Sequence, residues 1–224
     1  MLRVFIGYDP RQPVAYSVLQ FSLMRRSSRP VAITPLVIEQ LPIKRMGLTP
    51  FTYSRFLVPQ LCDFQGWGLF LDLDMLVQAD IAELFDMADE NSAVMVVKSG
   101  ARFEWASVIL FNCGHPDNRK LTPEYVEAAE GLHGIPWTNK IGSLPAEWNH
   151  LVMYDPPKPA KLLHYTAGMP CYPETKDLGY AEEWMKELKQ MTMIASWAQL
   201  MGSSIHAKPV LERLERAKQQ KPAG

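Results

Sequence analysis

The chain has 224 residues, of which 47% are hydrophobic and 21% are charged, and its formal net charge is −1 at pH 7. This composition is ordinary for a folded globular protein and argues against a disordered chain. Because the net charge is close to zero, no basic field exists to hold a nucleic acid, and we expect no nucleic-acid partner. The three cysteines form no CxxC pair and their odd count argues against a disulfide framework, so we expect a reducing, cytoplasmic location.

The chain is expected to begin with a strand, a helix and a second strand. Residues 2–8 are rich in β-forming side chains, and an Asp-Pro pair ends this strand too early for the apolar core of a signal peptide. A helix is expected over about 13–26 and a strand over 31–38. Pro35 lacks the N–H group that a central strand needs, so the second strand is expected at an edge of the sheet.

The most apolar segment, GLFLDLDMLV at 68–77, is expected to be a strand buried on both faces, as in a parallel sheet. Thr52 is expected to cap a preceding helix over about 53–61. No run of about 18 apolar residues occurs, so no transmembrane segment is expected. Further elements are expected downstream: a short helix at 80–88, strands at 93–98 and 106–111, a helix near 123–131, short strands at 151–154 and 161–165, and a helix over 180–200.

Strands that alternate with helices indicate a single α/β domain with a Rossmann-like, mostly parallel central sheet and flanking helices. We expect this domain to cover residues 1–207. The remaining residues, 208–224, are rich in charge and are expected to form an exposed tail that is helical in part.

Asp72 and Asp74 are the sharpest chemical signal, because they follow the apolar residues of the 68–77 strand. Alternation along a strand would point both carboxylates to one side and Leu73 to the other. Two such carboxylates repel each other and burial adds to the cost, so a cation is needed, and a hard divalent ion suits oxygen ligands. Ligands of open α/β sheets also bind beyond the carboxyl ends of strands. The pattern therefore predicts a metal and nucleotide site.

Two other interpretations of this pair remain open at this point. The aspartates could be solvated residues of a surface turn, although the flanking apolar run disfavours one. Phosphatases of the haloacid-dehalogenase type also carry Asp-x-Asp after a strand, but that strand is an early one. They have Thr or Val two residues after the second Asp, where this chain has Leu76.

Up to about residue 175, the chain resembles glycosyltransferase family 8, which includes glycogenin and bacterial lipopolysaccharide galactosyltransferases. The matching segments are VFIGYDPRQPVAYSV at 4–18, FTYSRFLVPQL at 51–61, GLFLDLDMLVQADIAELF at 68–85, LPAEWNHL at 144–151 and KLLHYTAGMPCYPE at 161–174. The block WASVILFNC at 105–113 suggests a poorly characterised bacterial branch of the family. The resemblance implies the GT-A fold.

The resemblance implies that Asp72 and Asp74 bind Mn²⁺ (or Mg²⁺), which bridges the two phosphates of a UDP-sugar, and that His164 is the third protein ligand. An imidazole beside two carboxylates favours Mn²⁺ over Mg²⁺, which prefers oxygen ligands throughout. A lone histidine is more often a core residue, but the place of His164 in HYTAG, downstream of the aspartate pair, favours a ligand.

The resemblance also implies that Tyr8 and Asp9 contact the uridine, that Arg55 lies near the nucleotide or the donor sugar, and that Gly168 belongs to a loop over the diphosphate. Each assignment has a structural alternative. Asp9 could simply end a strand, since Asp-Pro often opens a turn. Arg55 could be an exposed helix charge.

The implied activity is a retaining, metal-dependent transfer of sugar from a UDP-sugar to a hydroxyl of a saccharide or a lipid-linked acceptor. Such enzymes need no conventional base, and no catalytic residue is assigned. Trp148 and Asn149 are expected to pack and brace a loop rather than to line an acceptor site.

Several features depart from the family pattern. Trp105-Ala106-Ser107 replaces the usual Asn-x-Gly, no Asp-Gln-Asp segment is evident between 116 and 143, and TAGMP lacks the usual lysine. The stretch between Lys98 and Trp105 is also short, which could remove part of a lid that excludes water. These departures leave open a nucleotide-sugar-binding protein with a decayed active site, or a structural module that binds no nucleotide.

The tail is weakly basic over 208–221. It carries Lys208, Arg213, Arg216, Lys218 and Lys221 against Glu212 and Glu215. A solvated helix or a disordered tail is the ordinary interpretation. The alternative is a peripheral contact with the anionic inner face of a membrane. Nothing in the sequence predicts the oligomeric state.

Overall fold

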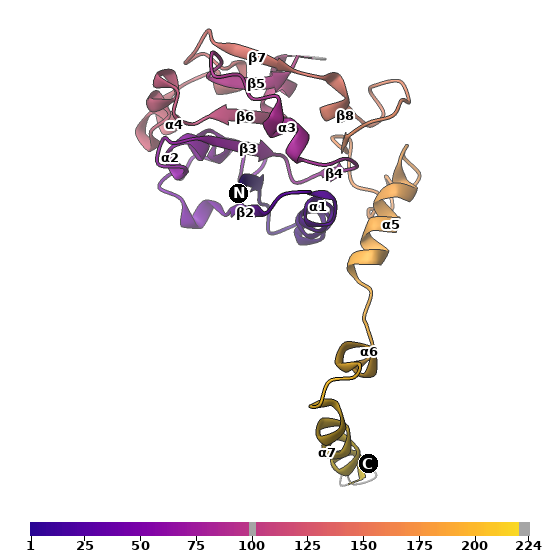
Figure 1. Ribbon diagram of the computed structural model, residues 1–224. Helices are drawn as coiled ribbons and strands as arrows, with labels where there is room; N and C mark the ends of the chain where they lie inside the picture. Colours follow the sequence, from indigo (N-terminus) through magenta and orange to yellow (C-terminus); the bar gives the residue numbers. More distant parts are fainter. Residues whose placement is uncertain (99–101, 220–224) are drawn as a thin grey trace. The chain divides into compact units, whose positions relative to one another are not determined.

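The computed structural model describes residues 1–98 and 102–219 (Figure 1). The short stretch expected between Lys98 and Trp105 falls in part on 99–101, outside the described residues, and Lys221 also lies outside them. The chain forms two compact units, Met1–Leu188 and Lys189–Gly224. A domain boundary between residues 207 and 208 stays a prediction.

The first unit is built on a six-stranded sheet in the order β2-β1-β3-β6-β5-β7. The strands are β1 (Leu2–Gly7), β2 (Val31–Leu36), β3 (Trp67–Leu71), β5 (Val94–Val97), β6 (Val108–Asn112) and β7 (Ile141–Leu144). Only β6 runs against its neighbours; the pairs β1–β2, β1–β3 and β5–β7 are parallel. The predicted mostly parallel α/β sheet is confirmed, although β7 was not expected.

The segment expected as one strand at 68–77 is divided between two sheets. Strand β3 ends at Leu71, and β4 (Met75–Val77) belongs to a three-stranded sheet of order β4-β9-β8, with β9 at Leu162–His164 and β8 at His150–Leu151. The prediction of a single strand is wrong because Leu73 and Asp74 form a turn. The segment is apolar on both sides of the aspartates because both strands, and Leu73 between the aspartates, are buried.

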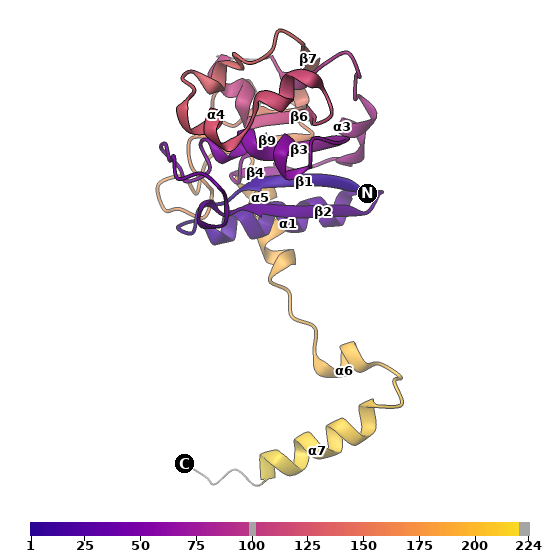
Figure 2. The same ribbon diagram turned by 90° about the vertical axis from the view of Figure 1, so that its left-hand side faces the viewer.

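The edge position of β2 is confirmed, with Pro35 opposite Ile6 of β1. Helix α1 (Pro13–Arg26) begins with proline at its first turn and ends with two arginines, both favourable for a helix. It packs against β2 and β4, and Figure 2 shows it alongside β1 and β2. Ser22 Oγ of α1 accepts a 3.2 Å hydrogen bond from Val77 N, which ties the helix to the smaller sheet.

The expected helix near 53–61 forms as a 3₁₀ turn, Ser54–Leu57, followed by α2 (Val58–Leu61). Thr52 does not cap it, because its hydroxyl oxygen accepts a 3.1 Å hydrogen bond from Thr49 N instead. The remaining α-helices that begin in this unit are α3 (Ala82–Asp86), α4 (Pro123–Ala128) and α5 (Ala181–Met191). Short 3₁₀ turns cover Ile38–Gln40, Arg102–Ser107, Pro116–Lys120, Leu132–Gly134 and Ala146–Trp148.

The core lies around the central strands, where every residue of β6 and Leu69–Leu71 of β3 are buried. Each large apolar side chain removed from water contributes roughly 1.5–3 kcal/mol to folding. Helix α5 contributes Trp184 and Glu187, and the Glu187 carboxylate pairs with Arg25 and Arg26 of α1 at 3.2 and 2.8 Å. This rigid core positions the polar residues at the strand ends.

The second unit contains α6 (Trp197–Met201) and α7 (Ala207–Gln219). The helix expected over 180–200 is therefore interrupted: Ser196 begins a new helix, with a capping box to Gln199. Helix α7 covers the described part of the expected tail, and it has no buried residue. Within the described residues, no helix combines the length and the apolar character that a membrane crossing requires.

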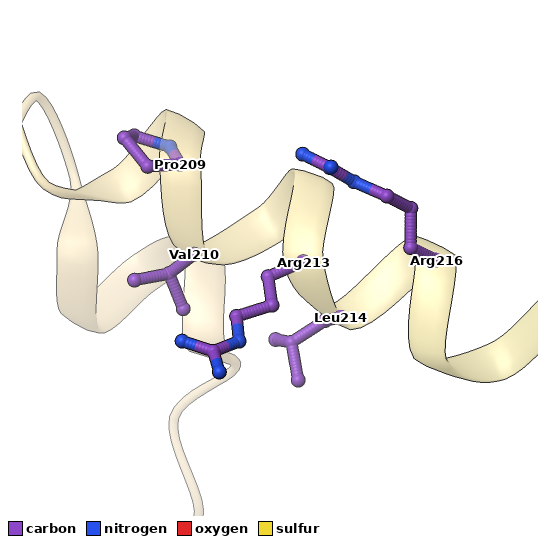
Figure 3. Close-up of a pocket in the computed structure, with 5 residues that line it drawn as sticks. All are labelled: Pro209, Val210, Arg213, Leu214 and Arg216. Carbon is purple, nitrogen blue, oxygen red and sulfur yellow. The ribbon is translucent and has the colours of Figure 1, made fainter.

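A hollow on the surface of α7 is lined by Pro209, Val210, Arg213, Leu214 and Arg216 (Figure 3). All five side chains come from this single helix, so the hollow is a gap between neighbouring side chains. It contains no carboxylate or imidazole, and the candidate functional site lies instead in the first unit.

Candidate metal and nucleotide site

The carboxyl end of β3 forms the centre of the site. Ile6 of β1 pairs with Leu71 of β3, so these parallel strands end at the same edge of the sheet. Asp72 follows Leu71, and its N–H donates to the carbonyl of Ser107 at 3.1 Å. Its side chain is almost fully buried, so the alternative of two solvated aspartates does not hold.

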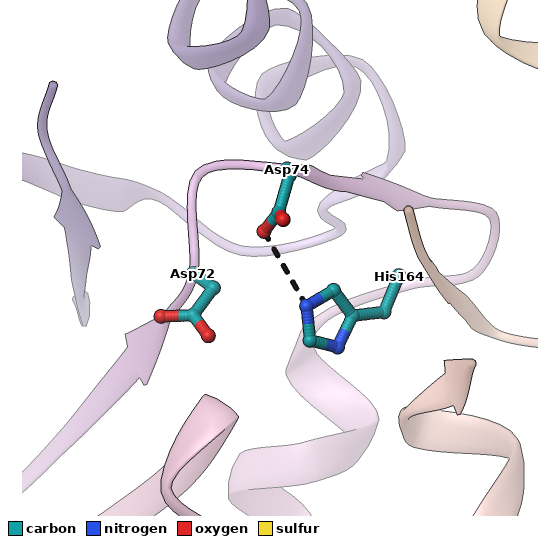
Figure 4. Close-up of side chains that lie close together, drawn as sticks. All are labelled: Asp72, Asp74 and His164. Atoms are coloured by element: carbon teal, nitrogen blue, oxygen red, sulfur yellow. Dashed lines mark ion pairs between the residues drawn. The ribbon is translucent and has the colours of Figure 1, made fainter. Parts of the chain in front are cut away.

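His164 reaches the aspartates through the smaller sheet. It is the last residue of β9 and lies opposite Met75 of β4, directly after Asp74. Its Nε2 is 3.4 Å from Oδ1 of Asp74. One ligand atom from each of Asp72, Asp74 and His164 lies within 4.8 Å of the other two (Figure 4).

The carboxylates converge for a different reason from the expected one. Strand alternation does not place them, because Asp72 follows the end of β3 and Asp74 lies in the turn. Leu73 between them is buried, which anchors the turn. The pairing of β4 with β9 then brings in the imidazole.

The charges in the cluster are strongly coupled. Burial raises the pKa of Asp72 above its ordinary value against the opposing charge of Arg55, and Asp74 raises it further. Burial also acts to raise the pKa of Asp74, but His164 outweighs this and the pKa is lowered. Burial acts to lower the pKa of His164, but Asp74 and Asp72 outweigh it and the pKa is raised. In this arrangement the imidazolium form of His164 offsets the carboxylates.

The residues present fit a divalent cation. Oδ1 of Asp72 is buried and accepts no hydrogen bond from the described part of the chain. Arg55 Nη2 lies 3.0 Å from it as an ion-pair contact only. The Asp74 side chain is 27% exposed, so the cluster is open to solvent on that side. Two carboxylates and one imidazole suit Mn²⁺ better than Mg²⁺.

Arg55 is a buried residue beside Asp72, and the alternative of an exposed helix charge is wrong. Its Nε donates to Thr52 O at 3.1 Å and its Nη1 to Ala106 O at 2.7 Å. The guanidinium carbon also lies 4.8 Å from the centre of the Phe70 ring. These contacts fix the arginine in place, where its charge offsets that of Asp72.

Tyr8 and Asp9 lie beyond the carboxyl end of β1, at the same edge as Asp72. The Asp9 side chain is buried, and both its oxygens accept hydrogen bonds from the Arg11 guanidinium, at 2.6–3.1 Å. These hydrogen bonds lower the pKa of Asp9. The Tyr8 ring packs edge-on against Tyr16, with ring centres 5.5 Å apart. Asp9 thus has a structural partner in Arg11, and its contact with a nucleotide stays a prediction.

Gly168 lies in the segment that follows β9. Its N–H donates to Tyr165 O at 2.8 Å and its φ is +125°. In the same segment, Tyr172 donates from its hydroxyl to Gln12 Oε1 at 2.9 Å. Burial raises the pKa of Tyr172, and the charges of Asp9 and Asp74 raise it further. The segment therefore runs close to both the β1 end and the aspartate turn.

Three residues that sequence reasoning did not assign to the site belong to its surroundings. Asn149, expected only to brace a loop, contacts His164 Nδ1 with its Oδ1 at 2.9 Å. Ser107 donates from its hydroxyl to Glu104 Oε2 at 3.3 Å, and it acts to lower the pKa of Asp72. The negative charge of Glu104 favours protonated His164. Spacing along the chain contains no signal for the contact of Asn149 with His164, because the pairing of β8 with β9 creates it.

The chain matches a protein-family model and a curated relative. The family model described as glycosyl transferase family 8 matches residues 18–126, a range that includes Arg55 and the aspartate pair. Protein CDI of Arabidopsis thaliana is 40% identical over an alignment that covers 84% of this chain and 86% of that protein. The expected placement in a bacterial branch is not supported, because this relative is a plant protein.

Solved structures show the same fold. The galactosyltransferase LgtC, in complex with donor and acceptor sugar analogues, gives a TM-score of 0.59 at 15% identity over 88% of this chain and 99% of LgtC. GlyE of Streptococcus pneumoniae TIGR4 gives 0.63 at 18% identity, over 97% of this chain and 63% of GlyE. The bifunctional WbbM gives 0.66 at 16% identity over 84% of this chain, which spans about half of WbbM. The expected GT-A fold is confirmed.

Proposed function

Because the chain belongs to glycosyl transferase family 8, and is therefore a glycosyltransferase, we propose that it uses a UDP-sugar donor and a divalent metal ion, and that it retains the anomeric configuration. The acceptor in this proposal is a hydroxyl of a saccharide or of a lipid-linked sugar. Family membership removes the phosphatase-like alternative.

The observation that carries the proposal is the convergence of Asp72, Asp74 and His164 from two different sheets. Two carboxylates held this close repel each other, and the buried Oδ1 of Asp72 has only the ion-pair contact with Arg55, so a further cation would stabilise them. The imidazolium of His164 offsets part of that charge, and a divalent ion would replace its proton.

In the proposal, Asp72, Asp74 and His164 hold the ion. A bound divalent ion supplies Lewis acidity that stabilises negative charge on the departing diphosphate. Arg55 keeps the Asp72 carboxylate oriented through its ion pair and its two main-chain hydrogen bonds.

The nucleotide would bind at the shared edge of β1 and β3. Tyr8 and Asp9 are proposed to contact the uridine from the end of β1, which follows the rule that ligands of open α/β sheets bind beyond the carboxyl ends of strands. Gly168 is proposed to bring main-chain atoms close to the diphosphate, since a residue without a Cβ permits close approach.

A direct test is release of UDP from a panel of UDP-sugars, with and without Mn²⁺, in the wild type and in Asp74→Asn. We expect metal-dependent release that increases with the right acceptor and is lost in the variant. Asp86→Asn is the matched control, because Asp86 forms a surface ion pair with Arg29. Metal-independent release, or release unaffected by Asp74→Asn, would contradict the proposed site.

A second candidate is a nucleotide-sugar-binding protein without transfer activity. It is favoured by Trp105-Ala106-Ser107, which stand where family members usually have Asn-x-Gly and lie beside Asp72 through the carbonyl of Ser107. This candidate predicts metal-dependent binding of UDP but no turnover with any acceptor. The release panel combined with calorimetric titration of UDP distinguishes the two, because metal-dependent binding without release identifies the second.

A further inference from the structure

We propose that Asn149 is the positioning residue for His164. Its amide oxygen holds the Nδ1–H group of the imidazole, so that Nε2 faces Asp74 and is the atom available to a divalent cation. The consequence for metal binding rests on the proposed function, whereas the hydrogen bond does not.

The geometry of the imidazole carries the inference. Nδ1 of His164 lies 2.9 Å from Oδ1 of Asn149, and the two side chains belong to residues that are 2% and 1% exposed. An amide oxygen only accepts hydrogen bonds, so Nδ1 is the donor. Nε2, on the other side of the ring, lies 3.4 Å from Asp74 Oδ1. Turning the ring over would break both contacts.

Asn149 is itself held in place by its neighbours in the chain. It lies between the 3₁₀ turn Ala146–Trp148 and strand β8, and its N–H donates to Ala146 O at 3.3 Å. The residues that follow it in β8 pair in parallel with β9, with Leu151 opposite His164. Trp148, on its other side, is fully buried. Asn149 is therefore fixed relative to the strand that carries the imidazole.

Loss of this acceptor has two physical consequences. The Nδ1–H group would become a buried donor without a partner, which is costly. The ring would also lose the contact that selects which nitrogen faces the aspartates. Removing the acceptor that orients a metal-binding histidine typically weakens metal binding roughly 10–100-fold.

Asn118 provides a matched control. It is fully buried, and its amide is also hydrogen-bonded: Nδ2 donates to Ala93 O and Asn112 O, both at 2.7 Å, and Oδ1 accepts from Trp137 Nε1 at 2.9 Å. Asn112 pairs with Trp67 at the start of β3, the opposite end of that strand from Asp72. Asn118→Ala therefore makes the same chemical change away from the site.

The first measurement is the affinity for Mn²⁺, which is determined from the electron paramagnetic resonance signal of the free ion. We expect Asn149→Ala to bind roughly 10–100-fold more weakly than the wild type, and Asn118→Ala to bind as the wild type does. Asn149→Asp should restore binding, because a carboxylate also accepts from Nδ1–H. Wild-type affinity in Asn149→Ala, together with lost binding in Asp74→Asn, would overturn the proposal.

The second measurement needs no metal. In the wild type, the Nδ1–H proton of His164 should give a nitrogen-15-correlated resonance that is protected from exchange. It should disappear in Asn149→Ala and persist in Asn118→Ala. A wild-type protein without this resonance, or an Asn149→Ala variant that keeps it, would overturn the positioning role. If the wild type binds no Mn²⁺ but shows the resonance, the proposed function fails and the hydrogen bond stands.

Discussion

Nη2 of Arg55 lies 3.0 Å from Oδ1 of Asp72, and the two side chains are only 7% and 11% exposed. The arginine also donates to two main-chain carbonyls, so it supplies a fixed positive charge to a buried carboxylate. This pair lies at the carboxyl end of β3, next to the residues that would hold a metal ion.

Replacing the arginine should therefore expose the cost of the buried carboxylate. We expect Arg55→Gln to lower the free energy of unfolding of the metal-free protein by roughly 3 kcal/mol, because it removes one partner of a buried pair. Mn²⁺ should recover more stability in this variant than in the wild type, since the ion also offsets the charge of Asp72. Urea denaturation with and without Mn²⁺ measures both effects.

Arg29→Gln is the control for this prediction, because Arg29 pairs with Asp86 at the surface. Its cost should be below about 1 kcal/mol and should not depend on Mn²⁺. An equal Mn²⁺-induced gain in the wild type and in Arg55→Gln would argue against a cation beside Asp72.

Metal affinity should fall as the pH falls. The pKa of His164 is raised above its ordinary value of 6.5, mainly by Asp74 against the effect of burial, so the metal-free imidazole holds a proton that binding must release. Release of one proton gives at most about a tenfold loss of affinity for each pH unit. Calorimetry of Mn²⁺ binding from pH 8 downward tests this, and a flat profile through the titration of His164 would contradict it.

The raised pKa of His164 should have the opposite pH dependence in the stability of the metal-free protein, which increases as the pH falls. Because folding raises the pKa of His164, its protonation contributes fully to the stability of the folded protein below the unfolded-state pKa of 6.5. This contribution is lost as the pH rises through the pKa of His164 in the folded protein. His164→Asn should remove this part of the pH dependence. Denaturation curves of the metal-free variant and wild type at several pH values give the comparison.

Gly168 should not tolerate a side chain. Its φ of +125° is one that L residues rarely adopt, and a Cβ would lie 2.7 Å from Cγ2 of Thr175. Backbone strain of this kind costs of order 1–3 kcal/mol, so Gly168→Ala should distort the segment and weaken UDP binding. Gly134→Ala is the control, because a Cβ added at that position would meet no heavy atom within 4 Å. Unchanged stability and UDP affinity in Gly168→Ala would contradict a constrained loop at the diphosphate.

Much of the fold follows from local patterns. β-forming residues predicted β1, apolar residues at helical spacing predicted α1, and Pro35 placed β2 at the sheet edge, because these signals depend on neighbouring residues only. The break of the 68–77 segment into two strands was missed, since a buried turn is as apolar as a strand. The expectation that Thr52 caps a helix was wrong, because the Thr52 hydroxyl accepts a hydrogen bond from Thr49 N instead.

The site was only partly predictable for the same reason. Asp72 and Asp74 are separated by a single residue in the sequence, and their apolar flanks already predicted a cation. Assigning His164 required the family resemblance, because it reaches the pair through the β4–β9 ladder. Asn149 carried no local signal at all, since its contact with His164 depends on how β8 and β9 pair.

The metal and nucleotide site is tested most directly by calorimetric titration of UDP into the purified protein, with and without Mn²⁺, in the wild type and in an Asp72→Asn/Asp74→Asn variant. We expect UDP to bind the wild type in a metal-dependent manner and the variant to lose that binding. Absence of UDP binding under every condition, or equal binding by the variant, would contradict a metal and nucleotide site at the end of β3.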